Sequence, residues 1–261
     1  MGNTDLVHNI FLKSEKLNDL VCKENFLYQY RPLNINTYDQ ILKGYLWADS
    51  PDKFNDILDC STYHTFIKRI YKKIGGKWVE KNPDDKADLI NKIKNSLLIS
   101  CLTSTNINTT MWSHYAEKNS GVCLKYDISK IKQKIYKVQY LDSLSSFKNF
   151  YTSVKEELEE RFNEVFITLL ALMKFSSWSY ENEYRYISLE RVRLDAPGQQ
   201  WEGKKVNDVK LTGICFGPKT SPTQISLVRK LVENKGIEIE RLNISYNRCE
   251  LKTSPLHNNE E

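Results

Sequence analysis

The 261-residue chain lacks the signatures of several common enzyme classes. It contains no P-loop, GxGxxG, HExxH or GxSxG pattern, which argues against a P-loop NTPase, a Rossmann dehydrogenase, an HExxH zinc protease and a serine hydrolase. Its six cysteines are scattered, and none belongs to a CxxC pair. Structural zinc is therefore not expected, and reduced, buried thiols fit this pattern better.

Long apolar runs and blocks of like charge are also missing. The longest apolar run, near residues 165–173, is far too short to span a bilayer, so we expect a cytoplasmic protein without membrane association. The 38 Lys and Arg residues exceed the 33 Asp and Glu residues, but no uninterrupted basic block occurs. The resulting net charge of +5 permits a nucleic acid or another acidic partner without requiring one.

Helical and strand-like segments alternate irregularly along the chain, without an internal repeat or a Gly/Ser-rich linker. Strands are expected at residues 26–31, 45–48, 96–103, 121–127, 134–141, 178–189, 208–216 and 237–244. Helices are expected at residues 4–21, 37–44, 61–74, 82–95, 111–115, 153–173 and 221–236. This order predicts a single α+β domain over residues 1–252, with a mixed or mostly antiparallel sheet, flanking helices and a disordered tail at 253–261.

The most informative polar pattern lies in the expected strand at 178–189. Strand alternation would place Glu181, Glu183 and Arg185 on one face. Side chains two residues apart on a strand face lie roughly 6.5–7 Å apart, so each carboxylate could reach one ligand while Arg185 keeps at least one of them ionised. This arrangement suits a site that holds a sugar hydroxyl or stabilises a developing cation. The alternative is a solvated face with a surface ion pair, which stabilises a fold by about 0–1 kcal/mol.

Two other polar groups allow both a functional and a structural interpretation. His114, in the short helix expected at 111–115, could contact a phosphate or act as an acid or base near pH 7, or it could satisfy a buried polar group beside Trp112. Upstream, a polar turn could supply ligands or could bond its own backbone, as Asn and Asp often do in turns; its members are Asn55, Asp56 and Asp59.

Six segments together resemble a bacterial family, the domain of unknown function 2971 (DUF2971). Motifs of that family have counterparts across almost the whole chain: Tyr28-Gln-Tyr30-Arg31, Phe54-Asn55-Asp56, Met111-Trp112-Ser-His114-Tyr115, Gly121-Val-Cys-Leu124, Trp178-Ser-Tyr-Glu181-Asn-Glu183-Tyr-Arg185 and Gly217-Pro218. The chain departs from the pattern at Ile57-Leu58, where the family has Pro-Phe. This resemblance implies membership of the family but no settled activity.

The opening layout, a strand that ends in a polar residue, a short helix and another strand, is similar to the start of ADP-ribosyltransferase-like domains. Glu181-Asn-Glu183 also looks like the Glu-x-Glu of one branch of that superfamily. The resemblance implies an ADP-ribosyltransferase-like core and an enzyme that uses or hydrolyses NAD, with a protein or nucleic acid as a possible acceptor. Such domains often serve as bacterial toxins or phage-defence effectors.

Roles for individual residues follow from the same resemblance. Glu183 would bind the nicotinamide-ribose hydroxyl and stabilise an oxocarbenium-like transition state, and Glu181 would orient or deprotonate the acceptor. Arg31 would hold the diphosphate or the adenosine ribose. We therefore expect catalytic contributions from Glu183, Glu181 and His114, and contacts with NAD from Arg31, Tyr30, Asn55, Asp56, Trp112, Tyr115 and Arg185.

Two other classes of function stay open. A metal-dependent nuclease or phosphoesterase would bind magnesium through the carboxylates Asp56, Asp59, Glu181 and Glu183. That class usually has a lysine two residues after a strand carboxylate, whereas this chain has Arg185, which cannot act as a general base at neutral pH. A non-catalytic nucleotide-sensing module would stack a base on aromatic side chains, for which the candidates are Tyr28, Tyr30, Trp47, Trp112 and Tyr115.

Overall fold

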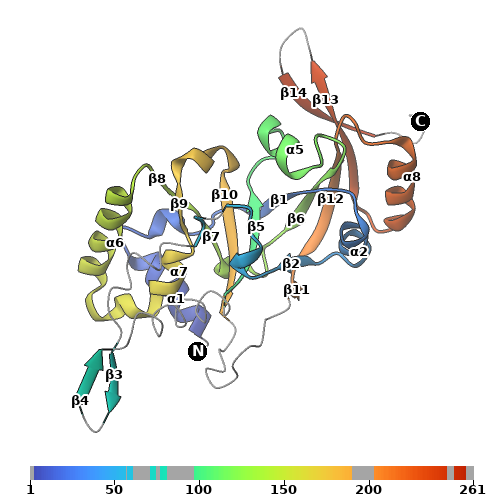
Figure 1. Ribbon diagram of the computed structural model, residues 1–261. Helices are drawn as coiled ribbons and strands as arrows, with labels where there is room; N and C mark the ends of the chain where they lie inside the picture. The colour runs from blue at the N-terminus through green and yellow to red at the C-terminus, as the bar shows by residue number, and fades with distance from the viewer. Residues whose placement is uncertain are drawn as a thin grey trace.

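One eight-stranded sheet dominates the fold in the computed structural model, which describes residues 3–56, 58–60, 71–74, 77–80, 97–189, 203–245 and 250–256. The strand order is β14-β13-β12-β6-β1-β5-β10-β7 (Figure 1). Neighbouring strands are antiparallel except β12 and β13, which are parallel. The strands are β1 (Phe26–Arg31), β5 (Leu97–Thr103), β6 (Val122–Asp127), β7 (Ile135–Lys137), β10 (Glu183–Leu189), β12 (Lys210–Phe216), β13 (Glu238–Ser245) and β14 (Glu250–Pro255).

Three two-stranded sheets accompany the main sheet. They pair β2 (Leu46–Ala48) with β11 (Lys204–Val206), β3 (Tyr71–Ile74) with β4 (Lys77–Glu80), and β8 (Gln139–Leu141) with β9 (Met173–Phe175). The α+β class and the mostly antiparallel sheet predicted from the sequence are thus confirmed.

Helices cover the two faces of the main sheet at opposite ends of the molecule (Figure 1). At the β10–β7 end lie α1 (Asn3–Lys13), α6 (Leu144–Leu158) and α7 (Phe162–Leu170), which share a buried apolar cluster with Ile99 and Ile187. At the other end, α2 (Ile35–Lys43) and α8 (Pro222–Leu231) pack on the opposite face against Leu98 and Leu124. A short helix, α5 (Thr109–Tyr115), covers Tyr30.

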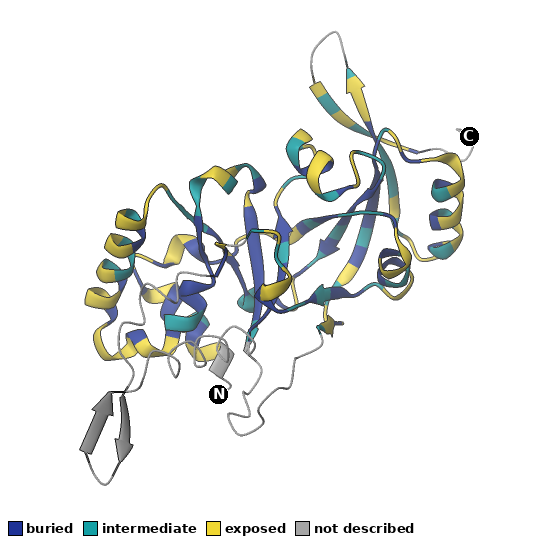
Figure 2. Ribbon diagram, in the orientation of Figure 1, coloured by how far each residue is buried: buried dark blue, intermediate teal, exposed yellow. Residues whose placement is uncertain are grey.

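Alternation along β5 explains how one strand serves both clusters. Leu97 and Ile99 point into the α1–α6–α7 side, whereas Leu98 and Leu102 point into the α2–α8 side. Figure 2 shows the central strands as the most buried part of the sheet. The strand expected at residues 96–103 is therefore confirmed over Leu97–Thr103, and it is buried on both faces.

The sheet is split between β1 and β5. These strands pair at a single position, Tyr28 with Thr103, whereas β5 pairs with β10 along its full length. Beyond Tyr28, the side chain of Gln29 reaches into the gap, and its Nε2 donates to the carbonyl oxygen of Cys101 at 3.3 Å. Farther along β5, Ile99 forms an antiparallel bridge with Asp49, directly after β2. The split is therefore short and bounded by pairing at both ends.

The segment before β10 differs from the expected strand at 178–189. Residues Ser176–Glu181 form a 3₁₀ helix, and Asn182, with a φ of 44°, turns the chain into β10, which begins at Glu183. Strand alternation correctly places Glu183 and Arg185 on one face, but Glu181 does not belong to that strand. Asn tolerates the left-handed region better than most residues, so the sequence contained a signal for this turn.

Other observed elements also differ from the predicted ones in their boundaries or type. The helix expected at 153–173 is two helices, α6 and α7, which meet at Glu159, where φ is 50°. Residues 71–74, expected to end a helix, form β3, and residues 253–255, expected to begin a disordered tail, lie in β14. The remaining residues of these two predictions, 61–70 and 257–261, and the helix expected at 82–95 lie outside the described ranges. No helix among the described residues is long and apolar enough to cross a membrane.

Candidate functional site

A cavity of about 630 Å³ lies at the split between β1 and β5, within the size range of small-molecule sites. Residues from β1, α2, β5, α5, the segments after β2 and β9, and the start of β10 line it. Tyr28, Thr103 and Glu183 are in register across three strands and so share a sheet face. Arg31, three residues beyond Tyr28, points to the other face. The cavity is lined by side chains from both faces.

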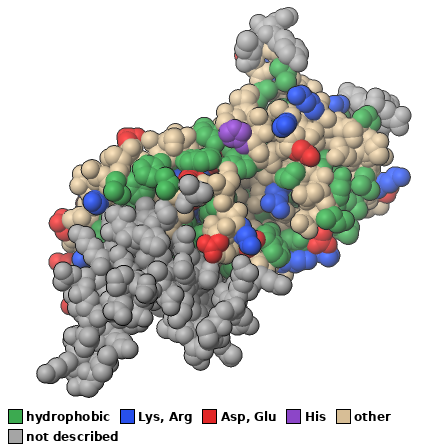
Figure 3. Space-filling model, viewed as in Figure 1, with side chains coloured by type: hydrophobic (Ala, Val, Ile, Leu, Met, Phe, Trp, Pro, Cys, Tyr) green, Lys and Arg blue, Asp and Glu red, His purple; other side chains and the backbone are tan. Residues whose placement is uncertain are grey.

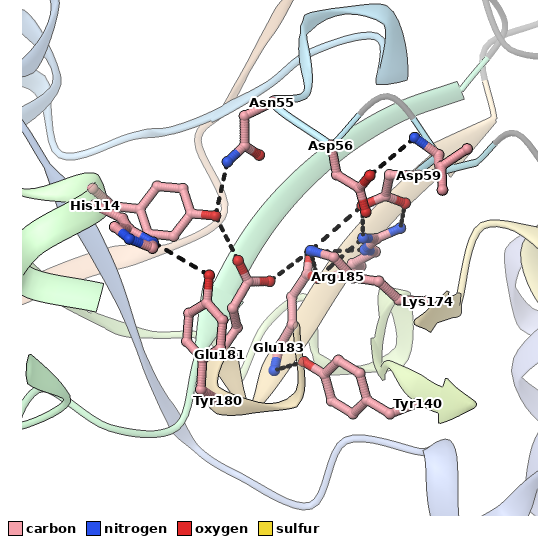
Figure 4. A network of polar contacts seen from close by, with 12 residues as sticks. Asn55, Asp56, Asp59, His114, Tyr140, Lys174, Tyr180, Glu181, Glu183 and Arg185 are labelled. Atoms are coloured by element: carbon pink, nitrogen blue, oxygen red, sulfur yellow. Dashed lines mark hydrogen bonds and ion pairs between the residues drawn. The ribbon is translucent and has the colours of Figure 1, made fainter. Parts of the chain in front are cut away.

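At the floor of this site, Arg185 joins two acidic side chains (Figure 4). Its guanidinium donates to both oxygens of Asp59, at 2.9 and 2.5 Å, and to both oxygens of Glu183, at 2.8 and 3.0 Å. A further bond goes to the Ala171 carbonyl oxygen at 2.7 Å. Arg185 is fully buried, so these charge-assisted bonds replace the water that the guanidinium loses.

Lys174, in β9, joins the same cluster at the point where three carboxylates converge. Its Nζ lies 2.6 Å from Glu181, 3.0 Å from Glu183 and 3.5 Å from Asp59. It also lies over the ring of Trp178, 4.9 Å from the centroid. Burial disfavours the ammonium, but the three carboxylates outweigh that effect and raise the pKa of Lys174, so the side chain stays charged.

The cluster contains three carboxylates and two cations, so one negative charge is uncompensated when all five groups are ionised. Burial would raise the pKa of Glu183, but the charges of Arg185 and Lys174 lower it to about 2. Burial and the charge of Glu183 raise the pKa of Glu181. Two adjacent carboxylates with pKa values moved apart are typical of acid–base sites. Of the two glutamates, Glu181 is therefore the more easily protonated.

Two tyrosines fix this carboxylate pair. Tyr115, at the end of α5, donates to Oε1 of Glu181 at 2.5 Å and accepts from Nδ2 of Asn55 at 3.1 Å. Tyr140, in β8, accepts from the backbone N–H of Glu183 at 2.9 Å. Glu181 is 4% exposed and Glu183 3%, and both line the cavity. The carboxylates are thus held at the bottom of the site.

Arg31 supplies the opposite charge on the other side of the split. Its side chain lines the cavity, forms no ion pair within the described residues, and its buried Nε has no hydrogen-bond partner there. Burial lowers the pKa of Arg31. Because guanidinium pKa values start so high, the group remains a cation. An anionic ligand group would supply the missing partner.

The structure brings together six of the ten predicted site residues along the cavity: Glu181, Glu183, Arg31, Tyr30, Asn55 and Tyr115. Arg185 does not line the cavity but lies beneath it, ion-paired with Asp59 and Glu183. Of the aromatic side chains expected to stack a base, Tyr28, Tyr30, Trp47 and Tyr115 line the cavity.

Three further predicted residues do not line this cavity. Trp112 is fully buried, packs edge-on against Tyr30 and donates from Nε1 to the Asn106 carbonyl oxygen, so it supports α5 from within the core. His114 is exposed, and its Nδ1 lies 3.3 Å from the Tyr180 hydroxyl. Asp56 accepts from the backbone N–H of Leu58 at 2.9 Å, the turn interaction considered as its structural alternative.

The same contacts bear on the magnesium alternative. Three of its four expected ligands already converge on the Lys174 ammonium, which lies where a divalent cation would have to sit. The fourth, Asp56, is bonded within its own turn. Among the described residues, no group of three His, Cys, Asp or Glu side chains has the arrangement of a metal site. This donor set therefore does not fit a magnesium ion.

Sequence reasoning missed Lys174 as a site residue, and Asp59 was considered only as a metal ligand or a turn residue. The available signal was a lone lysine within the otherwise apolar run Leu169–Phe175. Lysine is almost never fully buried unless it is paired, so a lysine in such a run indicates a buried ion pair. The partners could not be identified, since Asp59 is more than a hundred residues away in the sequence.

A comparison with protein families found a match to part of the chain. The model of DUF2971, a protein family of unknown function, matches residues 111–186. This span begins in α5, ends in β10 and includes Tyr115, Lys174, Glu181, Glu183 and Arg185. Over residues 111–186, this match supports the family predicted from the sequence motifs. Neither the curated proteins nor the solved structures contain a significant match to the chain.

Proposed function

We propose that this member of the DUF2971 family of unknown function binds NAD in the split between β1 and β5 and cleaves the bond between nicotinamide and ribose. One observation carries the proposal. A single cavity is lined by a cation without an acidic partner in the described chain and by two carboxylates whose pKa values are moved apart. A dinucleotide has the complementary groups, a diphosphate and a ribose that becomes cationic as nicotinamide leaves.

The cluster's charge suits that transition state. With Glu181 ionised, Asp59, Glu181 and Glu183 exceed Lys174 and Arg185 by one negative charge. A positive charge that develops on the ribose beside Glu181 would restore neutrality, and preorganised charges of this kind stabilise a transition state strongly. We assign this role to Glu181 and Glu183 together, with Glu183 as the permanently ionised member. Glu181 can also take a proton from the acceptor.

The other side of the split would hold the rest of the dinucleotide. Arg31 would form charge-assisted bonds with the diphosphate, and the exposed Lys53, also on the cavity wall, would add a second cation. Trp47 and Tyr28 offer ring faces for a base. An enzyme that consumes NAD in this way would suit a toxin or a phage-defence effector, the biological role that we propose with it.

The test is incubation of the purified wild type and two variants with NAD, following nicotinamide release. Glu181→Gln should lower the rate at least about 100-fold, since it removes charge at the reacting centre. Arg31→Met should mainly raise KM, by about tenfold or more, as expected for a lost charge-assisted bond. Glu164→Gln, an exposed change of the same type on α7, is the matched control and should behave as wild type.

Two outcomes would contradict the proposal in different ways. If the wild type binds NAD but releases no nicotinamide, the site is a nucleotide sensor. If it neither binds nor consumes NAD, the cavity has another ligand, and dinucleotide binding is wrong altogether.

A further inference from the structure

We propose that the acceptor of the ADP-ribosyl group is water, so that the protein hydrolyses NAD and does not modify a macromolecule. This inference rests on the proposed function and specifies its second substrate. The argument depends on the depth of the carboxylate pair, on the side chains above it and on the charge of the surrounding surface.

Depth comes first. A nucleophile must come within about 3–3.5 Å of the ribose carbon that nicotinamide leaves. In the proposed complex that carbon lies beside Glu181 and Glu183, which are 4% and 3% exposed. A protein side chain or a nucleobase would have to bring its backbone down into the split to reach them. A water molecule needs no such space.

A polar bridge lies above Glu181. Asn55, from the segment after β2, donates to the Tyr115 hydroxyl, which in turn donates to Glu181. The bridge connects the segment after β2 with α5, and Figure 4 shows the dashed contacts that join Asn55 to Glu181 through a hydroxyl. The Glu181 carboxylate can still be reached from within the cavity. Asn55 and the Tyr115 hydroxyl, however, narrow the direct path from the protein surface to this carboxylate.

Among the described residues on the face shown in Figure 3, basic side chains are interspersed with acidic and uncharged ones and form no continuous basic area. Binding a nucleic acid acceptor depends largely on such an area, because phosphate contacts dominate its affinity.

The reaction balances with water as the only co-reactant. The bond between the ribose carbon and the nicotinamide nitrogen breaks, and its electron pair leaves with nicotinamide as the neutral ring. The oxygen of water forms the new bond to the ribose carbon. One proton of this water passes to Glu181 and then to solvent, and the other stays on the new hydroxyl group of ADP-ribose. The products are nicotinamide, ADP-ribose and one proton.

The first experiment uses NAD labelled in its adenosine part, with the full chain, in buffer, in cell lysate and with added RNA and DNA. Free ADP-ribose should equal released nicotinamide in every condition, and label in protein or nucleic acid should stay below about one hundredth of it. Label in a macromolecule with a matching deficit of ADP-ribose would overturn the inference but leave NAD cleavage intact. No nicotinamide release in any condition would overturn the proposed function itself.

A second experiment measures the size of acceptor that the site admits. With methanol added, methyl-ADP-ribose should form beside ADP-ribose, whereas benzyl alcohol should give a small but measurable amount of product, at least about twentyfold less than methanol. Asn55→Ala removes the bridge but keeps the bond from Tyr115 to Glu181, so the share of benzyl product should rise at least about fivefold relative to methanol. Asn163→Ala, an exposed change on α7, is the matched control. Equal use of both alcohols by the wild type would show that the site does not select small acceptors.

Discussion

At the scale of single residues, the two glutamates of the cluster should respond to pH in opposite ways. The folded state raises the pKa of Glu181, so this group stabilises the fold at low pH, and its contribution is lost as pH rises through the folded pKa. Glu181→Gln keeps this side chain neutral at every pH. The free energy of unfolding of the variant, relative to wild type, should therefore increase as pH rises from about 4 and then level off.

Unfolding in urea at a series of pH values measures this difference. Glu164→Gln provides the control, for which the difference should not vary with pH. A difference for Glu181→Gln that falls with rising pH would mean that the ionised carboxylate is the stabilised form, contrary to the charge count of the cluster.

The contribution of Glu183 to stability depends on pH in the opposite direction. Arg185 and Lys174 lower its pKa to about 2, so its contribution to stability is present above its ordinary pKa and is lost as pH falls toward 2. Glu183→Gln should cost about 3 kcal/mol at neutral pH, the scale expected for such a shift and for breaking a buried ion pair. The cost should shrink below pH 4. A variant as stable as wild type at pH 7 would show that the ion pairs contribute no net stability.

At the scale of elements, Asn182 determines how the two glutamates are placed relative to each other. It ends the 3₁₀ helix Ser176–Glu181 in the left-handed region and starts β10. Because of this turn, Glu181 and Glu183 come from two elements and meet at Lys174, although only one residue separates them. A continuous strand would have kept both side chains on one face.

Replacing Asn182 tests this turn. Asn182→Gly should leave the free energy of unfolding within about 1 kcal/mol of wild type, since glycine adopts a positive φ freely. Asn182→Val should lower it by about 1–3 kcal/mol, because a β-branched residue is strained at this φ. Thermal unfolding of the two variants side by side gives the comparison, and equal stability would argue against the left-handed turn.

At the scale of the whole molecule, the ligand site that we propose in the split between β1 and β5 should make stability depend on ligand. A nucleotide that binds only the folded chain stabilises it by mass action, by about 2.7 kcal/mol at a concentration 100 times Kd. ADP-ribose, which carries the diphosphate but no bond to cleave, should therefore raise Tm in wild type. Arg31→Met should need at least about tenfold more ADP-ribose for the same rise. An unchanged dose response in the variant would remove Arg31 from the ligand site.

The sequence by itself determined the features that depend on local pattern. A short, nearly continuous apolar run identified β5, and the α+β class followed from the order of elements. Motifs such as Met111–Tyr115 identified the family that matches residues 111–186. The helix expected at residues 37–44 ends at Gly44, whose φ of 72° suits glycine. These features can be predicted from the sequence alone because each depends on neighbouring residues and on the periodicity of apolar side chains in a helix or strand.

Only the tertiary structure decided how the site is built. Lys174 and Arg185 meet Asp59 across more than a hundred residues of chain, and the direction of each pKa shift depends on that three-dimensional count of charges. The same packing buries Trp112, leaves His114 exposed and opens the cavity where Gln29 interrupts strand pairing. Electrostatic interaction and desolvation act through space, so sequence pattern alone could name many of the site's residues but not their charge states or their partners.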